Sequence, residues 1–240
     1  MSKKEKLFIS VISNLVLGCM VALVFVSCFF TSKKQAQQTS NSEYNGTVYA
    51  GDKSSKNVSL MINVYWGDEY LDAMLKSLKQ YGAKATFFVG GSWAKKNPEM
   101  LKRIYSEGHE IGNHGYTHKE HGKLDYTKNL SEIQTCHEIV RDILGVDMEL
   151  FAPPGGSYNS NTIKSAEFLN YKTIMWTRDT IDWRDKDTSL IYNRAITNMS
   201  GGDLILMHPT KNTAEALGDI LKYINDHDFT AVSVSQTLGF

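Results

Sequence analysis

The sequence is poor in cysteine, and this scarcity limits how the chain can be stabilised. Three cysteines occur in 240 residues: Cys19 and Cys28 lie in an apolar N-terminal run, and Cys136 is alone in the rest of the chain. No disulfide can therefore form within the main domain unless another chain supplies the second thiol. An exported protein without bridges points to a bacterial surface.

Clustered basic residues are also absent beyond the N-terminus. The chain has 26 basic and 26 acidic residues, and residues 1–34 hold five lysines and one glutamate, which leaves 21 basic against 25 acidic residues in the remainder. Binding to a nucleic-acid backbone relies on clustered lysine and arginine, so no nucleic-acid partner is expected. A neutral glycan is a better match for a domain with a net charge of about −4.

A long hydrophobic run occurs at one place, from Leu7 to Phe30, and three lysines precede it. This length spans a bilayer, whereas the apolar part of a cleaved signal peptide is about 7 to 15 residues. We therefore expect residues 1–30 to form an uncleaved transmembrane signal anchor. The basic N-terminus would stay in the cytoplasm, which places a single-pass protein in the cell membrane with its domain on the extracytoplasmic side. Cleavage would instead give a secreted protein.

Residues 31–57 are rich in serine, glutamine, lysine, asparagine and glycine, which predicts a flexible extracytoplasmic linker. From residue 58 to residue 240, short apolar runs alternate with amphipathic segments, beginning with a strand at Val58–Val64 and a helix at Glu69–Tyr81 and ending with a strand at Thr230–Val234. This order predicts one α/β domain with about seven to eight parallel strands, as a barrel or a doubly wound sheet.

The segment from Glu110 to His118 is the strongest chemical signal, because it sets His114 and His118 four residues apart after a predicted buried strand. Neutral imidazole is a common ligand of Zn²⁺, and catalytic zinc sites usually add a carboxylate and leave one position open. The other histidines of the domain, except His208, are interpreted as packed or solvated; they are His109, His121, His137 and His227.

Four segments in order carry a family resemblance: Lys84-Ala-Thr-Phe-Phe-Val, Gly108-His-Glu-Ile-Gly-Asn-His114, Phe151-Ala-Pro-Pro-Gly and Leu204-Ile-Leu-Met-His208. Through them the domain resembles the family 4 carbohydrate esterases, the NodB-like polysaccharide deacetylases. The resemblance implies a distorted (β/α) barrel of seven to eight units that removes acetyl groups from glycans such as cell-wall peptidoglycan. It also implies one divalent metal, zinc first, with cobalt or manganese as alternatives.

The same resemblance implies roles for individual residues. His114 and His118 would bind the metal, His208 would be the general acid, and Asp182 would orient it. Substrate contacts are implied for Trp183 and Leu206, which would line the acetyl pocket, and for Pro153 and Gly155, where a rigid backbone would present an N–H to an oxyanion.

The first and third family motifs depart from the family pattern. Where the family has an Asp-Asp pair, acting as general base and metal ligand, this chain has Tyr65-Trp66, and where the family has an arginine that pairs with the base, it has Ala152. Loss of the base alone would leave a buried arginine unpaired, at a cost of several kcal/mol. Joint replacement avoids that cost and indicates a rearranged site.

Two hypotheses follow from these departures. In the first, the protein is a metal-dependent peptidoglycan N-deacetylase in which Asp68 or Glu69 folds back to replace the lost carboxylate. In the second, it is a catalytically impaired or inactive member that binds glycan or acts as a scaffold. Acidic residues are also favourable in the first turn of a helix, which gives Asp68 and Glu69 a purely structural alternative role.

Overall fold

The computed structural model describes residues 43–44 and 46–240, so the expected anchor at residues 1–30 and most of the expected linker lie outside the described residues. Among the residues it does describe, no helix is both long enough and apolar enough to be a membrane span.

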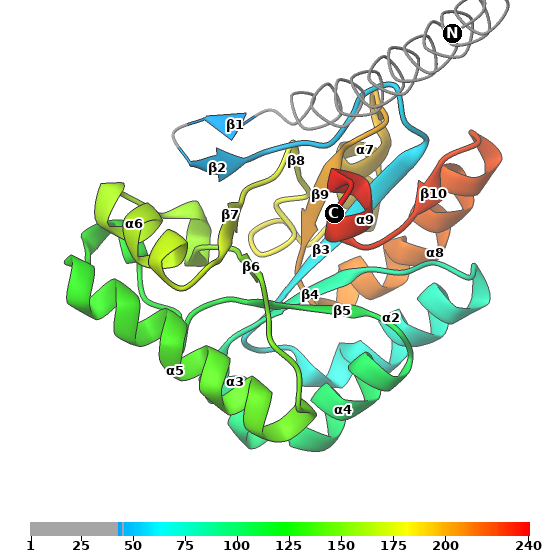
Figure 1. The fold of residues 1–240 in the computed structure, drawn as a ribbon. Coiled ribbons are helices and arrows are strands. Elements are labelled where there is room, and N and C mark those ends of the chain that lie inside the picture. The colour runs from blue at the N-terminus through cyan, green and yellow to red at the C-terminus, as the bar shows by residue number, and fades with distance from the viewer. Residues whose placement is uncertain (1–42, 45) are drawn as a thin grey trace, which may run out of the picture. The chain divides into compact units, whose positions relative to one another are not determined.

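A single curled sheet organises the described part of the chain (Figure 1). Its strands follow the order β1-β2-β7-β6-β5-β4-β3-β9-β8, with β10 also paired to β3. Every pairing is parallel except the one between β1 and β2. The bounds are β1 Glu43–Tyr44, β2 Thr47–Val48, β3 Asn57–Val64, β4 Thr86–Val89, β5 Glu110–Asn113, β6 Leu150–Phe151, β7 Lys172–Ile174, β8 Arg178–Asp179, β9 Leu204–Met207 and β10 Thr230–Ala231. Because β1 and β8 are end strands that do not pair with each other, the domain is an open α/β half-barrel rather than a closed barrel.

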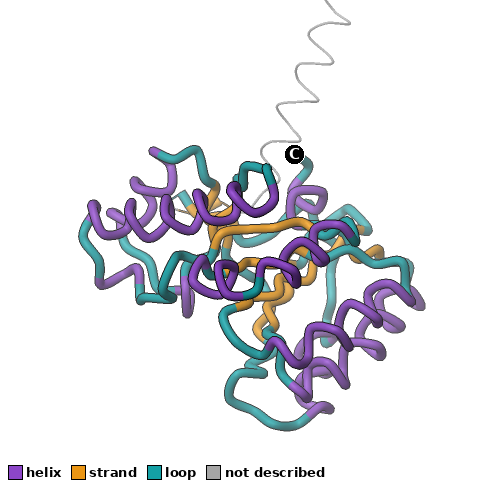
Figure 2. Tube along the Cα trace, turned by 90° about the horizontal axis from the view of Figure 1, so that it is seen from below, coloured by secondary structure: helices purple, strands orange, loops and turns teal. Residues whose placement is uncertain are grey.

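Most of the strands lie between helices, in the middle of the described domain (Figure 2). They are α2 Asp68–Gln80, α3 Gly91–Lys96, α4 Pro98–Ser106, α5 Tyr126–Leu144, α6 Ser160–Phe168, α7 Thr188–Ile196, α8 Lys211–Asp226 and α9 Val234–Leu238, with 3₁₀ turns at His121–Lys123 and Pro154–Gly156. Local signals fix their ends: Asp125 caps α5 by accepting a hydrogen bond from the Lys128 N–H, and Gly145 ends it in the left-handed region.

Alternate residues of β3 face two different apolar clusters. Leu60 and Ile62 pack in the larger cluster, which includes residues of α2, α5 and α8, whereas Met61 packs in a smaller cluster with Phe88. This period of two is the one expected of a strand buried on both faces.

The last expected strand, Thr230–Val234, is shorter in the structure and ends at Ala231. Val234 instead begins α9, because the side chains of Ser233 and Gln236 form a reciprocal capping box. Val234 and Leu238 then pack in the smaller apolar cluster. The Ser-x-x-Gln spacing was the available signal for this helix.

The folded part of the chain also begins before residue 58. Thr47 and Val48 pair with Thr173 and Ile174 of β7, and both Thr47 and Val48 are buried. The prediction from polar composition that the linker extends to residue 57 is therefore wrong, because the folded domain already includes Thr47 and Val48. A strand of only two residues adds too little apolar sequence to be recognised by composition.

Candidate functional site

Carboxyl ends of neighbouring parallel strands bring most of the expected site residues to one edge of the sheet. The strands β6, β5, β4, β3 and β9 are consecutive neighbours. The residues that follow their ends are Tyr65 and Trp66 after β3, His114 after β5, Ala152 after β6 and His208 after β9. Side chains of different motifs consequently meet although they are far apart in sequence.

His114 is almost completely buried, with 1% of its surface exposed. Its Nδ1 lies 2.7 Å from the carbonyl oxygen of Ala152, so Nδ1 donates a proton and Nε2 keeps its lone pair. Burial, followed by the effect of the neighbouring His118, lowers the pKa of His114 well below its ordinary value. The neutral imidazole with an oriented Nε2 has the form required of a metal ligand.

His118 lies beside His114, with 5.1 Å between the ring centroids. Its backbone adopts the left-handed region at φ 56°, which is uncommon for a residue other than glycine. Burial, followed by the charge of His208, lowers the pKa of His118 as well. The pair of histidines therefore presents two neutral imidazoles next to each other.

A buried carboxylate from α5 holds the loop between the two histidines. One Glu132 oxygen accepts hydrogen bonds from the Tyr116 N–H at 3.0 Å and the Thr117 N–H at 2.7 Å, and the other accepts the Thr117 hydroxyl at 2.7 Å. Lys119 Nζ lies 2.9 Å from the second oxygen. Burial alone would raise the pKa of Glu132, but the hydrogen bonds from Thr117 and Lys119 outweigh it and lower the pKa.

His208 and Asp182 form the other side of the site. His208 Nδ1 lies 2.8 Å from one Asp182 oxygen, and the other oxygen accepts from the His208 N–H and the Thr213 hydroxyl, each at 2.6 Å. The Asp182 side chain is fully buried, while 15% of the His208 side chain is exposed. Because Nδ1 donates to the carboxylate, Nε2 is the atom of His208 that can exchange a proton with a bound molecule.

Aromatic rings occupy the two positions where the family resemblance leads one to expect carboxylates. The Tyr65 ring lies 4.9 Å from the His118 ring and packs so closely on Gly90 that a Cβ there would lie 2.4 Å from a ring carbon. The Trp66 ring stacks on His208 at 5.9 Å with an interplanar angle of 9°, and 44% of its surface is exposed. Neither ring supplies an acidic group to the histidines.

Asp68 and Glu69 lie in the first turn of α2. The Asp68 carboxylate accepts a hydrogen bond from the indole N–H of Trp93. Across residues 43–44 and 46–240 no group of three or more histidine, cysteine, aspartate or glutamate side chains is placed to hold a metal ion. This arrangement favours the helix-terminus role of the two acids. Two imidazoles also fall short of the three protein ligands that a catalytic zinc site normally has.

Comparison with known proteins identifies the domain. A family model described as polysaccharide deacetylase matches residues 50–174. A peptidoglycan-N-acetylglucosamine deacetylase of Bacillus cereus is 33% identical over 186 residues, which cover 71% of this chain and 83% of that protein. The chain belongs to the polysaccharide deacetylase family. An uncharacterized protein of Bacillus subtilis, YlxY, is 37% identical over 191 residues, but this chain spans only 60% of its length.

Solved structures agree with this membership of the deacetylase family. A CE4 family pseudoenzyme from Bacillus anthracis superposes with a TM-score of 0.79 at 34% identity, covering 82% of this chain and 70% of that one. A mutant of the same pseudoenzyme with restored enzymatic activity gives a TM-score of 0.79 at 32% identity, covering 82% and 72%. The curled half-barrel is thus the NodB-type fold that the motifs imply.

The other expected positions of the deacetylase domain lie around these two histidine groups. Ala152 is fully buried in the smaller apolar cluster, and Pro153 beside it is buried too. Gly155 lies in the 3₁₀ turn with φ 60° and is exposed. Leu206 is 3% exposed on β9, and Trp183, directly after Asp182, is 58% exposed. Trp183 and Gly155 are therefore the exposed members of this set.

The sequence patterns do not reveal Glu132, which holds the loop between His114 and His118, or Thr213, which holds the Asp182 carboxylate. Both lie on amphipathic helices, where a polar residue on the inward face was the only signal.

His121 is packed in the interior, as the sequence predicts: it is fully buried, and its Nδ1 lies 2.7 Å from the Asn129 side-chain oxygen. Within the described residues its Nε2 has no hydrogen-bond partner.

Proposed function

We propose that this protein acts on cell-wall peptidoglycan as an N-deacetylase-like protein, directed at the acetamido groups of amino sugars. The observation that carries the proposal is the arrangement on the acid side of the site, in which the Asp182 carboxylate holds His208 and is itself held by the Thr213 hydroxyl. Hydrolysis would convert an acetamido group and water into a free amine and acetate. In that reaction His208 would deliver a proton from Nε2 to the departing nitrogen, and Trp183 and Leu206 would contact the acetyl-bearing sugar.

The altered first motif lowers the rate of hydrolysis that we expect. Loss of a general base typically lowers a rate by about 10² to 10⁴. The Asp68 carboxylate is bonded to Trp93, and among the described residues no carboxylate completes a metal-binding group with His114 and His118. His114 and His118 would hold a divalent metal, zinc first and cobalt or manganese next, only weakly. When bound, such a metal would polarise the acetyl oxygen.

A second candidate function is glycan binding without turnover, as a pseudoenzyme or scaffold. The specific observation in its favour is that Tyr65 and Trp66 fill the positions of the lost carboxylates, with Trp66 stacked on His208. An exposed indole is a suitable surface for the apolar face of a sugar ring. The relative of known structure that is a CE4 pseudoenzyme supports this alternative.

One experiment separates the two functions. Acetate release from purified peptidoglycan is measured with added Zn²⁺ or Co²⁺ for the wild type, for His114→Ala, and for the triple variant Tyr65→Asp, Trp66→Asp, Ala152→Arg. Hydrolysis predicts release by the wild type above the His114→Ala background. Equal release by these two proteins excludes hydrolysis, and activity gained by the triple variant would then show that the rest of the site is competent.

We also propose that residues 1–30 anchor the protein in the cell membrane with the domain outside. The uncharged apolar run and the lysines before it support this location. Protease added to intact protoplasts should remove the domain and leave a small membrane-bound fragment. Recovery of the whole chain in the culture medium would indicate cleavage instead, and full protection from the protease would contradict an external domain.

A further inference from the structure

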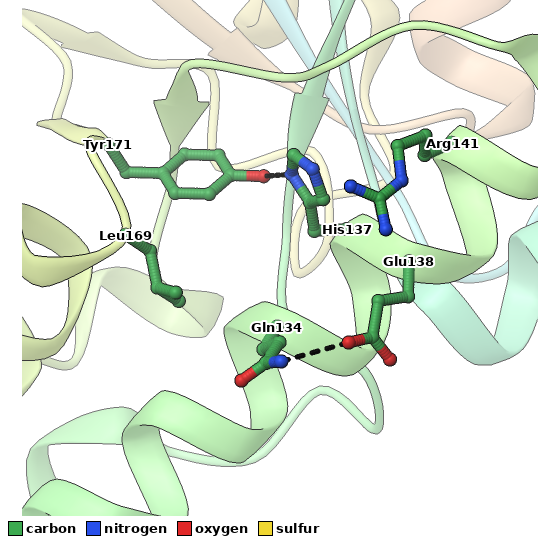
Figure 3. Close-up of a pocket in the computed structure, with 6 residues that line it drawn as sticks. All are labelled: Gln134, His137, Glu138, Arg141, Leu169 and Tyr171. Carbon is green, nitrogen blue, oxygen red and sulfur yellow. Dashed lines mark hydrogen bonds between the residues drawn. The ribbon is translucent and has the colours of Figure 1, made fainter.

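A pocket of about 200 Å³ opens on the helical side of the domain, and none of its residues belongs to the deacetylase motifs (Figure 3). Four of its residues lie on α5 and two lie between α6 and β7. They are Gln134, His137, Glu138, Arg141, Leu169 and Tyr171. The volume suits a ligand the size of an amino acid or a dipeptide terminus.

Hydrogen bonds connect this pocket to the loop that carries His114. Asp147 accepts from His137 Nε2 at 3.1 Å, and His137 Nδ1 lies 2.5 Å from the Tyr171 hydroxyl. That hydroxyl in turn accepts from the Asn113 side-chain N–H at 3.2 Å, and the Asn113 side-chain oxygen accepts the Gly115 N–H at 2.9 Å. Donors and acceptors match at every step, so a change at the pocket can reach the residue next to His114.

The pocket also carries charges that the protein does not pair with each other. Arg141 makes no side-chain hydrogen bond to any described residue, and its nearest carboxylate oxygen, on Asp147, is 3.9 Å away. Within the described part of the chain, Glu138, one turn earlier on α5, accepts a hydrogen bond only from Gln134, at 2.9 Å. The pocket therefore holds a cation whose ion pair, with Asp147, is long, and an anion that forms no ion pair with any described residue, beside the apolar side chain of Leu169 (Figure 3).

These charges restrict the ligand. The planar guanidinium of Arg141 is suited to a carboxylate, which it can bind through two parallel hydrogen bonds. Two carboxylates, Glu138 and Asp147, lie near it, so an isolated anion would be repelled while a ligand that also carries an ammonium group would not. The same balance of charge disfavours a phosphate dianion.

We propose that this pocket is a second ligand site, which binds the zwitterionic end of an amino acid or short peptide and is coupled through Tyr171 to the His114 loop. Arg141 would take the carboxylate, Glu138 the ammonium group and Leu169 the apolar side chain. The binding site stands on these contacts alone. Its assignment to the peptide part of peptidoglycan rests on the proposed function, and binding is measured without any hydrolysis.

The test uses the full-length protein and three matched probes at constant ionic strength: alanyl-alanine, its N-acetyl form and its C-terminal amide. Binding is followed by backbone amide NMR shifts. A dissociation constant on the order of 1 mM is expected for alanyl-alanine, a ligand of about eleven heavy atoms. The two modified probes each lose one charged contact and should bind at least tenfold more weakly.

Variants locate the site. Arg141→Gln should weaken alanyl-alanine binding at least tenfold, whereas Lys128→Gln, which removes an exposed cation from the same helix, should leave it unchanged. Equal binding of the amide and the dipeptide, an unaffected Arg141→Gln variant, or no shift at about 50 mM probe would each overturn the site.

The coupling has its own control. Binding should shift the Gly115 amide resonance in the wild type and not in Tyr171→Phe, which keeps the ring but removes the hydroxyl. A Gly115 shift that persists in Tyr171→Phe would disprove coupling through the hydrogen bonds of Tyr171. Acetate release measured separately distinguishes failure of this site from failure of the proposed deacetylase function.

Discussion

Replacing Glu132 by glutamine should destabilise the domain strongly, although the two side chains have almost the same shape. Only 7% of the Glu132 side chain is exposed, and its two oxygens receive two N–H groups, one hydroxyl and one ammonium group. Glutamine retains one oxygen and places an NH₂ group against the remaining donors. Leaving a buried donor unpaired costs about 1–3 kcal/mol, and hydrogen bonds to a charged group are at the upper end. We expect a loss of about 3 kcal/mol.

This loss can be measured as the free energy of unfolding in urea, or as a fall in melting temperature. About 3 kcal/mol corresponds to roughly 6–12 °C for a domain of this size. Glu120→Gln is the matched control, because Glu120 forms an exposed ion pair with Lys123 and should change stability by less than about 0.5 kcal/mol. A Glu132→Gln variant as stable as this control would refute the view that Glu132 holds the loop between His114 and His118.

Three further predictions concern buried polar groups. Thr213→Val removes a hydroxyl donor from the Asp182 carboxylate and should cost about 1–3 kcal/mol in urea unfolding; no change would mean that the bond contributes nothing. Burial, followed by Lys84, lowers the pKa of His109 to about 4. The folded state therefore favours neutral His109. The resulting contribution to the free energy of unfolding is fully present above pH 6.5 and is lost as the pH falls toward 4, with about 2 kcal/mol lost at pH 5. His109→Gln should lack this part of the pH dependence, and an identical pH profile would contradict it. Burial raises the pKa of the Cys136 thiol to about 12, so iodoacetamide should modify the Cys136 peptide only after unfolding, as followed by mass spectrometry; rapid modification of native protein would contradict its burial.

Much of the fold is predictable because its longer elements have clear periodicity. The expected strand Val58–Val64 is observed as Asn57–Val64, and the expected helix Glu69–Tyr81 is observed one residue earlier at each end, as Asp68–Gln80. The elements that were missed are short. β8 has two residues and α3 has six, so each is held by its neighbours rather than by a pattern of its own.

The candidate site is predictable in its identity but not in its detail. The sequence predicts that His114, His118 and His208 lie close together, because each follows a predicted strand and the carboxyl ends of parallel strands meet at one edge of the sheet. The position of Asp68 depends on its hydrogen bond to Trp93, which lies 25 residues away, and no local signal reveals such a contact. The inward-facing Glu132 is likewise recognisable only when α5 has been placed against the loop.

The strand β3 ends its pairing with β4 at Val64, one residue before Tyr65 and two before Trp66. The chemistry of the first motif is thus carried by residues that contribute no ladder hydrogen bonds, and it can be exchanged without breaking the sheet. The two acids could be replaced at positions 65 and 66 during evolution without a change in the fold of the sheet. The same separation means that the change is reversible in principle, so a line of descendants could regain the acids through substitutions at a few positions instead of rebuilding a fold.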